Sequence, residues 1–266
     1  MPKGWTGRRV AAILVAVGAA AACSVPARPA AAACRPLGAT VMRCVFVTHG
    51  APPPSNPLAR TVPRNDSCTN SEFHFNGSPA GAPWSARGYT YFANLAKMPH
   101  GDADRRAITK GRHSWDHMRA GCGLRDVTNF TTRYGGRTRA TMHSRRDHVS
   151  VVDFGSLAPF TRDPAAVAIT LVWWKNRHIV ETDSRFEQPP SIPAGTFSWS
   201  VAAGRRERRW DLWGMAAHES GHALGLAHAT SSRDNRLTMS PVQYLNSVRW
   251  RTLGRGDVLG LRALYP

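Results

Sequence analysis

The stretch HESGHALGLAH, at residues 218–228, constrains the fold of this 266-residue chain more than any other feature. On a helix, His218 and His222 lie one turn apart on the same face, where two imidazoles can converge on one ion. Gly225 comes where such a helix must stop, because glycine readily adopts the left-handed backbone that ends a helix. The turned chain can then bring His228 to the same ion. The spacing predicts three neutral nitrogen ligands and an open fourth position, which is typical of catalytic rather than structural zinc sites.

Glu219 and a later methionine strengthen this prediction. Glu219 lies next to the first histidine, angled to reach a metal-bound water without binding the metal itself. The alternative is a buried alanine-rich helix with incidental histidines, and a bare HExxH pair would not decide between the two. However, five positions of the extended pattern agree, and LTMSP places Met239 eleven residues after His228. The extended pattern and the methionine together favour a zinc site.

With these residues in place, the chain resembles the metzincin zinc endopeptidases, and most of all the matrixin-like family of secreted bacterial proteases. The family pattern H-E-x-x-H-x-x-G-x-x-H is met at residues 218–228, and its methionine turn falls at Met239. Pro241 is matrixin-like, because astacins and serralysins carry a tyrosine at that place. The resemblance is specific over residues 218–266 and topological over residues 68–209.

Two further segments carry the resemblance. The closing RTLGRGDVLGLRALYP is similar to the last helix of the family, with matches at Asp257, Gly260, Leu264, Tyr265 and Pro266. HIVETDSRF, at residues 178–186, looks like the family's edge strand, so that an extended protein or peptide substrate would pair along residues 179–185. The resemblance also implies a disulfide between Cys68 and Cys122, one catalytic zinc, and calcium as a further candidate cation.

The fold implied by the resemblance is an α+β metzincin-type catalytic domain. It has a twisted, mostly parallel sheet with an antiparallel edge strand, long helices that include the zinc-binding helix, and a small C-terminal subdomain that ends in a helix. The residue pattern itself predicts a helix over residues 104–121, with Ile108, Trp115 and Met118 on one face. It predicts strands in GYTYFANL, HVSVVDF, AVAITLVWW and HIVETDSRF, which are rich in β-branched and aromatic residues.

The chemistry implied is peptide hydrolysis without a covalent intermediate. Zinc held by the three histidines would lower the pKa of its bound water to around 7. Glu219 would take the proton of this water as general base and hand it to the departing amine. Met239 would support the site from below as a packed, polarisable side chain.

Two features depart from the better-known animal matrixins. The chain has no PRCGxPD cysteine switch, and PRNDSC at residues 63–68 is not a disguised version of it. Latency through a thiol on the zinc is therefore not expected. The histidine and aspartate cluster that holds a second, structural zinc in those relatives is not recognisable, so we assign a single metal.

The first 33 residues are typical of a secretory signal peptide, and we expect a secreted protein. Basic residues precede an apolar run from Val10 to Ala22 that is too short to span a membrane. Small-residue cleavage sites end at both Ala22 and Ala33, which leaves the cleavage site open. The sequence before Cys23 loosely resembles a lipoprotein box, so membrane attachment would require lipidation of this cysteine.

The segment that follows, residues 34–66, is predicted to be a linker or pro-segment outside the core, and residues 67–266 to be the catalytic domain. Five prolines exclude regular helix from the linker segment: Pro52, Pro53, Pro54, Pro57 and Pro63. Cleavage after Ala33 would leave four cysteines, an even number that indicates two disulfides in an oxidising compartment.

The charge of the chain is strongly basic. The formal net charge is +18, and removal of residues 1–33 with their four basic residues leaves 18 − 4 = +14. The basic residues are scattered and not interleaved with aromatics, so we expect a solvated surface and no nucleic-acid partner. We also expect a monomer. The charge supports one alternative function, a catalytically silent cationic protein that retains the metzincin fold and binds an anionic cell surface. A zinc amidase that cuts cell-wall peptides is a third hypothesis.

Other residues of catalytic type have simpler interpretations. His113 and His117 are four apart but lack a neighbouring glutamate and a third ligand, which favours a solvated or packing role. Glu181 and Asp183 could bind calcium, but alternating carboxylates on a strand usually face solvent. Cys122 is expected in a disulfide rather than as a nucleophile.

Overall fold

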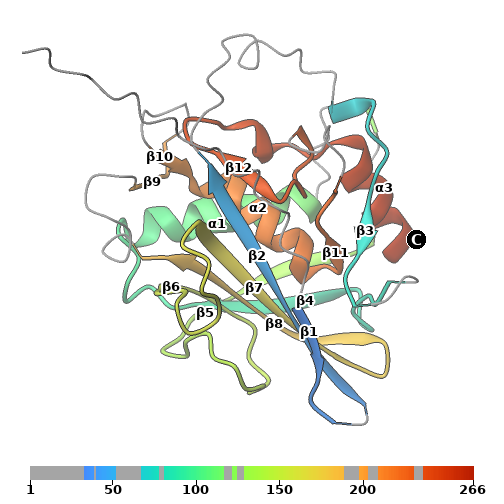
Figure 1. Ribbon diagram of the computed structural model, residues 1–266, viewed down its shortest axis with the longest axis horizontal. Coiled ribbons are helices and arrows are strands. Elements are labelled where there is room, and N and C mark those ends of the chain that lie inside the picture. The colour runs from blue at the N-terminus through green and yellow to red at the C-terminus, as the bar shows by residue number, and fades with distance from the viewer. Residues whose placement is uncertain are drawn as a thin grey trace, which may run out of the picture.

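The computed structural model describes residues 33–38, 40–51, 67–77, 81–116, 122–124, 129–188, 198–202, 209–230 and 236–266. In these residues one mixed sheet packs against two long helices, and a third helix lies at the C-terminal end (Figure 1). The helices are α1 (Asp102–Asp116), α2 (Leu212–Ala223) and α3 (Arg255–Leu264), with a short 3-10 helix η5 (Arg249–Arg251). The strands are β1 (Ala33–Pro36), β2 (Val41–Ala51), β3 (His74–Phe75), β4 (Gly88–Ala93), β5 (Thr131–Arg137), β6 (Val151–Gly155), β7 (Ala166–Lys175), β8 (His178–Glu187), β9 (Ser198–Ser200), β10 (Arg209–Asp211), β11 (Leu226–Ala227) and β12 (Val242–Tyr244).

The main sheet has eight strands in the order β1-β2-β7-β8-β6-β4-β5, with β12 paired to β2. Four pairings are parallel: β8 with β6, β6 with β4, β4 with β5, and β12 with β2. The pairings of β1 with β2, β2 with β7, and β7 with β8 are antiparallel. A mostly parallel sheet packed with helices confirms the expected α+β class.

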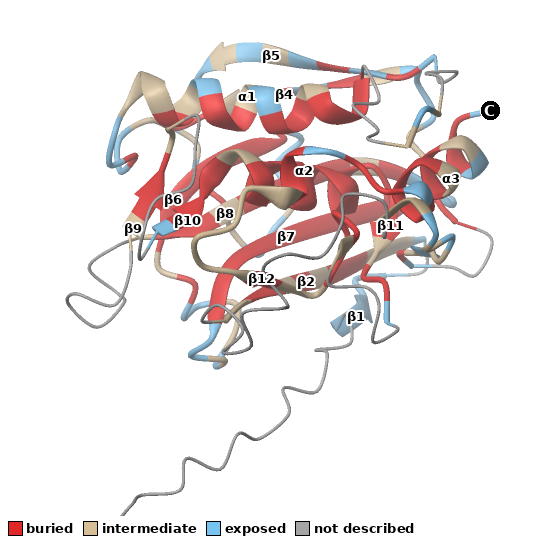
Figure 2. Cartoon of the chain, turned by 90° about the horizontal axis from the view of Figure 1, so that it is seen from above, coloured by how far each residue is buried: buried red, intermediate tan, exposed pale blue. Residues whose placement is uncertain are grey.

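Strand β8 lies inside the sheet, between β7 and β6. The prediction that HIVETDSRF forms an edge strand, free to pair with substrate along residues 179–185, is therefore wrong. Strand β7 is buried along its length except at Lys175, and Figure 2 shows β7 and β8 as a buried layer beneath α2. Strands covered on both faces have nearly continuous apolar sequences, which is why AVAITLVWW was recognisable as a strand.

The prediction that residues 34–66 lie outside the core is wrong for their first half. Strand β2 pairs with β7 from Val41 to His49, and Phe46 is 1% exposed. A disulfide between Cys34 and Cys44 joins β1 to β2. The prolines that indicated a linker fall in residues 52–66, outside the described part of the chain.

Other predictions concern segments at or beyond the limits of the described residues. The predicted signal peptide, apart from Ala33, and Cys23 lie outside them. The second disulfide joins Cys68 to Cys122, the pair implied by the resemblance. None of the helices described has the length and apolar character needed to cross a membrane.

Helices α1 and α2 pack closely against each other on the face of the sheet that carries the site. Trp115 of α1 is 1% exposed, and its indole Nε1 donates to the carbonyl of Ala217 at 2.7 Å. A Cβ on Gly111 would lie 2.7 Å from the Cβ of Ala216, so a glycine is needed for this close approach. The contact fixes the helix that bears the histidines.

Candidate active site

Helix α2 supplies two of the three histidines predicted to bind zinc. Asp211 caps its first turn, because the carboxylate accepts a hydrogen bond from the backbone N–H of Gly214 at 3.0 Å. His218 and His222 follow on one face of the helix, with their Nε2 atoms 3.1 Å apart. The helix spacing expected from the sequence therefore brings the two imidazoles together.

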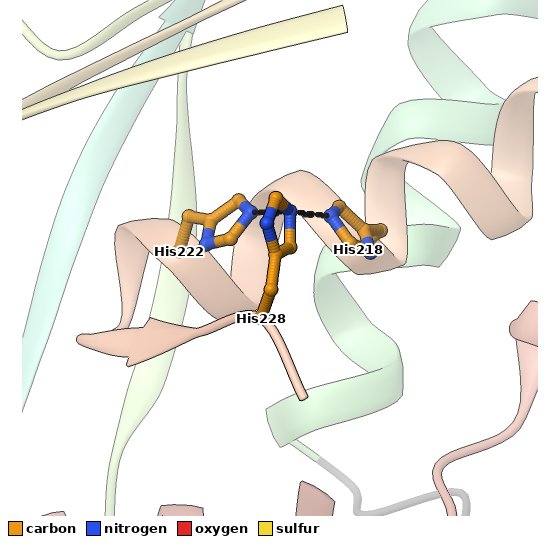
Figure 3. A group of neighbouring side chains, drawn as sticks. All are labelled: His218, His222 and His228. Atoms are coloured by element: carbon orange, nitrogen blue, oxygen red, sulfur yellow. Dashed lines mark hydrogen bonds between the residues drawn. The ribbon is translucent and has the colours of Figure 1, made fainter. Parts of the chain in front are cut away.

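The third histidine reaches the same point through the turn after α2. Gly225 has a φ of +109°, and a Cβ there would lie 3.1 Å from Leu264, so the position requires glycine. The returning chain places Nε2 of His228 3.1 Å from that of His218 and 3.0 Å from that of His222 (Figure 3). The three side chains form one group that could hold a metal ion.

Backbone carbonyls fix the tautomers of two of these histidines. Nδ1 of His218 donates to the carbonyl of Thr238 at 2.6 Å, and Nδ1 of His222 donates to the carbonyl of Leu226 at 2.8 Å. A neutral imidazole carries one N–H, so each Nε2 presents a lone pair to the centre of the group. Burial lowers the pKa of all three histidines, that of His218 to about 4, which keeps the rings neutral.

This donor set fits zinc. Lone pairs that converge repel one another unless a cation lies between them. The nitrogen ligands of a tetrahedral zinc, each 2.0–2.1 Å from the metal, lie about 3.3 Å apart. The observed separations of 3.0–3.1 Å are close to that value. A core cluster held only by hydrogen bonds would instead place a donor opposite each lone pair.

Glu219 is 1% exposed and has both carboxylate oxygens engaged. Oε1 accepts from the hydroxyl of Thr48 at 2.6 Å, and Oε2 accepts from the hydroxyl of Thr170 at 2.6 Å. Burial raises the pKa of Glu219 to about 7, while the two hydroxyls and the charge of Arg112 oppose that rise. The sequence predicted the place of Glu219 beside the first histidine, but not its two threonine partners.

A buried arginine supports this carboxylate from α1. Arg112 is 2% exposed and donates to the hydroxyl of Tyr89 and, at 3.4 Å, to Oγ of Ser184. Oγ of Ser184 lies 2.9 Å from Oγ1 of Thr170, which donates to Glu219. Burial lowers the pKa of Arg112 to about 9, so it still carries a charge at neutral pH. The hydrogen-bonded path therefore links the carboxylate to a positive charge.

Met239 packs beneath α2, as expected for the methionine turn. A Cβ on Gly221 would overlap its Sδ, so glycine lets the helix rest directly on the methionine. Two residues later, the carbonyl of Pro241 accepts from the backbone N–H of His49 at 3.1 Å. This contact brings strand β2 beside the turn.

The methionine turn is tied to the start of α3 by Asp257, one of the residues that matched the family's last helix. This carboxylate is 1% exposed and accepts three backbone hydrogen bonds, from Thr238 at 2.8 Å, Met239 at 3.1 Å and Gly254 at 2.7 Å. Burial raises its pKa to about 6. The carboxylate therefore ties the methionine turn to the start of α3.

Asn76 supports the turn that leads to the third histidine, and it was not predicted. Its side-chain Nδ2 donates to the carbonyls of His222 at 2.8 Å and Leu226 at 3.2 Å. These bonds hold the turn that carries the chain to His228. An asparagine in a short polar stretch gives no sequence signal for such a role.

Comparison with protein families gives a match of residues 128–266 to the matrixin model. The chain belongs to the matrixin family. It is therefore a zinc-dependent metalloprotease of the metzincin type, and the family implies a catalytic zinc with which the three histidines are consistent. The match includes α2, the methionine turn and α3, while α1 and β2 lie outside it. No curated protein matches the chain.

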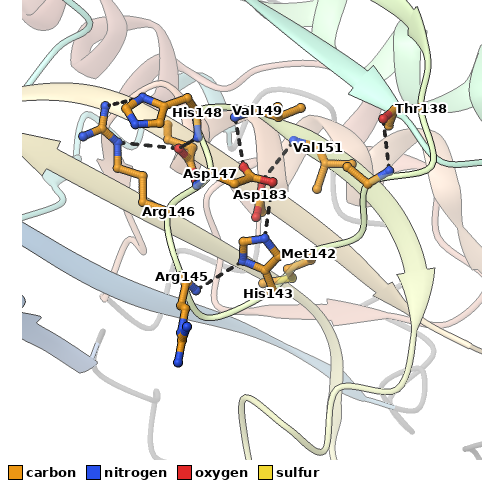
Figure 4. Close-up of polar contacts among 12 residues, drawn as sticks. Thr138, Met142, His143, Arg145, Arg146, Asp147, His148, Val149, Val151 and Asp183 are labelled. Carbon is orange, nitrogen blue, oxygen red and sulfur yellow. Dashed lines mark hydrogen bonds and ion pairs between the residues drawn. The ribbon is translucent and has the colours of Figure 1, made fainter.

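The remaining candidate residues have structural surroundings. Glu181 and Asp183 are buried, so the expectation that they face solvent is wrong. Glu181 accepts from the backbone N–H groups of Asp147 at 3.1 Å and His148 at 2.5 Å. Asp183 accepts from that of Val151 at 2.9 Å, as Figure 4 shows. These oxygens hold the loop before β6 and the first residue of that strand.

The histidine of α1 lies apart from the site. The side chain of His113 is 44% exposed, and its Nε2 lies 3.9 Å from Oδ2 of Asp116. Its predicted companion, His117, lies outside the described residues. A solvated role for His113 agrees with this exposure.

Proposed function

We propose that this matrixin is a secreted endopeptidase in which His218, His222 and His228 hold one zinc and Glu219 is the general base. The observation that carries the proposal is the convergence of three buried imidazole nitrogens beside an engaged carboxylate. Gly225, by its left-handed turn, makes that convergence possible.

Glu219 has the properties that the mechanism needs. When bound, zinc supplies a Lewis acid that acidifies water and polarises the scissile carbonyl. Glu219 orients the attacking water, takes its proton at a carboxylate oxygen and delivers that proton to the leaving amine nitrogen. Burial raises the pKa of Glu219, so the carboxylate takes up a proton more readily than an exposed glutamate does.

Secretion is proposed from two independent features. The first 33 residues are typical of a signal peptide. The described cysteines form two disulfides, which persist in oxidising compartments.

The test compares the full chain with its Glu219→Gln variant, both expressed in an oxidising compartment. Bound zinc is measured per chain, and cleavage of denatured casein is followed with and without a zinc chelator. We expect one zinc in both proteins and chelator-sensitive cleavage that falls by about 100-fold or more in the variant. Equal cleavage by the two proteins, or no bound zinc, would contradict the proposal. Purified cell wall, assayed in parallel, distinguishes an amidase.

A further inference from the structure

Strand β2 crosses the candidate active site between strands β7 and β12. It pairs antiparallel with β7 from Val41 to His49 and parallel with β12 over residues 49–51. In Figure 1 it runs across α2, the helix of His218 and His222. Strand β7 consequently has β8 along one edge and β2 along the other.

Two alternate side chains of β2 point at the site. The ring of Phe46 stacks on that of His222, with centroids 4.5 Å apart and planes inclined by 19°. The hydroxyl of Thr48 donates to Oε1 of Glu219 at 2.6 Å. Residues two apart on a strand share a face, so both contacts come from one face of β2. The strand covers one proposed metal ligand and occupies one oxygen of the proposed base.

These contacts close the site to a polypeptide. His218 and His222 are 0% exposed, and Glu219 is 1% exposed. The second oxygen of Glu219 is held by Thr170. With both oxygens engaged and the histidines buried, cleavage by the full chain comes from the fraction of molecules in which β2 has left β7.

The position of β2 is one that an extended peptide could take. A strand edge binds a partner through backbone N–H and carbonyl groups, so the pairing does not depend on the partner's sequence. Strand β7 borders the site directly, since its Thr170 contacts Glu219. We propose that β2 is an inhibitory strand that holds the place of the substrate, and that the enzyme becomes active when β2 leaves β7.

This inference rests on the proposed function and specifies how its site is regulated. An incoming peptide would pair antiparallel with β7 and parallel with β12, as β2 does. The described cysteines are joined in two disulfides, so none of them offers a thiol to the metal. Instead, the ring of Phe46 covers His222 and the hydroxyl of Thr48 bonds to Glu219. Since the Cys34–Cys44 disulfide joins β1 to β2, the two strands leave as one hairpin.

The test loosens the strand and then fixes it again, in the full-length chain. The loosened chain carries Phe46→Ala and Thr48→Ala. The locked chain adds Val47→Cys and Ile169→Cys, which face each other in the register of β2 and β7 and pack on the other face of the sheet. The matched control adds Val47→Cys alone. Mass spectrometry verifies the new disulfide.

The primary readout is binding of an extended tetrapeptide hydroxamate to the cobalt-loaded chains, followed by their visible absorption, and the second is cleavage of denatured casein. We expect the loosened chain to bind the hydroxamate at least about tenfold more tightly than the wild type, because the buried Phe46 no longer holds the strand. The control should keep this gain and the locked chain should lose it. Thr48→Val, which removes only the hydroxyl bonded to Glu219, is the second variant should the loosened chain fail to fold.

Two results would overturn the inference: a loosened chain that binds no tighter than the wild type, or a locked chain that binds as tightly as the control. Failure of the proposed function is distinguishable from both. Hydroxamate binding in the expected order without casein cleavage by any chain would support the inhibitory strand and contradict the endopeptidase. Absence of bound cobalt in every chain would contradict both proposals together.

Discussion

The three histidines of α2 and its turn differ from the two buried carboxylates of β8 in how their polar atoms are satisfied. Glu181 accepts from backbone N–H groups of the loop before β6 and Asp183 accepts from that of Val151 at the start of β6, so the chain itself supplies their donors. The Nε2 atoms of His218, His222 and His228 face one another, and the tautomers of His218 and His222 leave their lone pairs at the centre. Burial alone therefore does not indicate function. Of these two clusters, the one whose partners come from the chain is structural, whereas the one that needs a partner from outside indicates a bound ligand.

The largest effect is expected from removal of a proposed metal ligand. His228→Ala should weaken zinc binding by about a thousandfold, because three ligands share the binding free energy and one is lost. Competition with a chelator of known affinity measures this. The matched control is Glu181→Gln, whose side chain is equally buried and should leave zinc affinity unchanged. An equal fall in zinc affinity in both variants would contradict the distinction between the histidine cluster and the carboxylates of β8.

Removal of a carboxylate whose hydrogen-bond donors come from the chain should instead reduce the stability of the fold. Glu181→Ala removes the acceptor of the backbone N–H groups of Asp147 and His148 and the partner of Arg146, 3.6 Å away. We expect the free energy of unfolding to fall by about 3–4 kcal/mol, with zinc affinity unchanged. Urea unfolding measures the first quantity. A fall in zinc affinity without a fall in the free energy of unfolding would contradict the structural role assigned to Glu181.

Asp257 is also a buried carboxylate whose hydrogen-bond donors come from the chain, and its contribution to the free energy of unfolding should depend on pH. Its ordinary pKa is 3.8 and its pKa in the folded protein is about 6, so the folded state binds the proton more tightly. The stability that it contributes is therefore present below pH 3.8 and is lost as the pH rises through 6. Relative to Asp257→Asn, the free energy of unfolding of the metal-free wild type should fall by about 3 kcal/mol over this range.

The control for this pH dependence is the exposed Asp102. Bonds to Arg105 and the nearby charge of Arg137 lower its pKa, so its stabilising contribution is present above the ordinary pKa and is lost as the pH falls. The difference between wild type and Asp102→Asn should therefore change with pH in the opposite direction. Differences of the same sign for the two aspartates would show that Asp257 does not titrate as described.

The smallest effect is expected from a change at Asn76, which supports the turn between the histidines. Asn76→Ala removes two hydrogen bonds to the turn between His222 and Leu226 without touching a ligand nitrogen. We expect zinc affinity to fall about tenfold. If the loss matched that of His228→Ala, Asn76 would have to act on the metal directly.

The parts of the site that the sequence predicted are local. His218, His222, Gly225 and His228 lie within eleven residues, so helix geometry and one glycine turn decide their arrangement. Likewise, β6, β7 and β8 were predicted because β-branched and aromatic runs have a local signature. Met239 was predicted from its distance along the chain.

The parts that the sequence did not predict depend on long-range pairing. Nothing in HIVETDSRF indicates which strands flank it, so an inner strand was mistaken for an edge. The contact of Phe46 with His222 joins residues far apart in the chain, and neighbouring prolines suggested a linker. Thr48 and Thr170 are ordinary β-formers, and only the folded sheet places their hydroxyls on Glu219.

The most direct measurement is X-ray absorption spectroscopy of the zinc-loaded full chain and of its His228→Ala variant. The account predicts three imidazole nitrogens at about 2.0–2.1 Å from the metal in the wild type, with no sulfur ligand, and two in the variant. A sulfur ligand in the wild type, or an unchanged number of imidazoles in the variant, would contradict the assignment of His218, His222 and His228 as the zinc site.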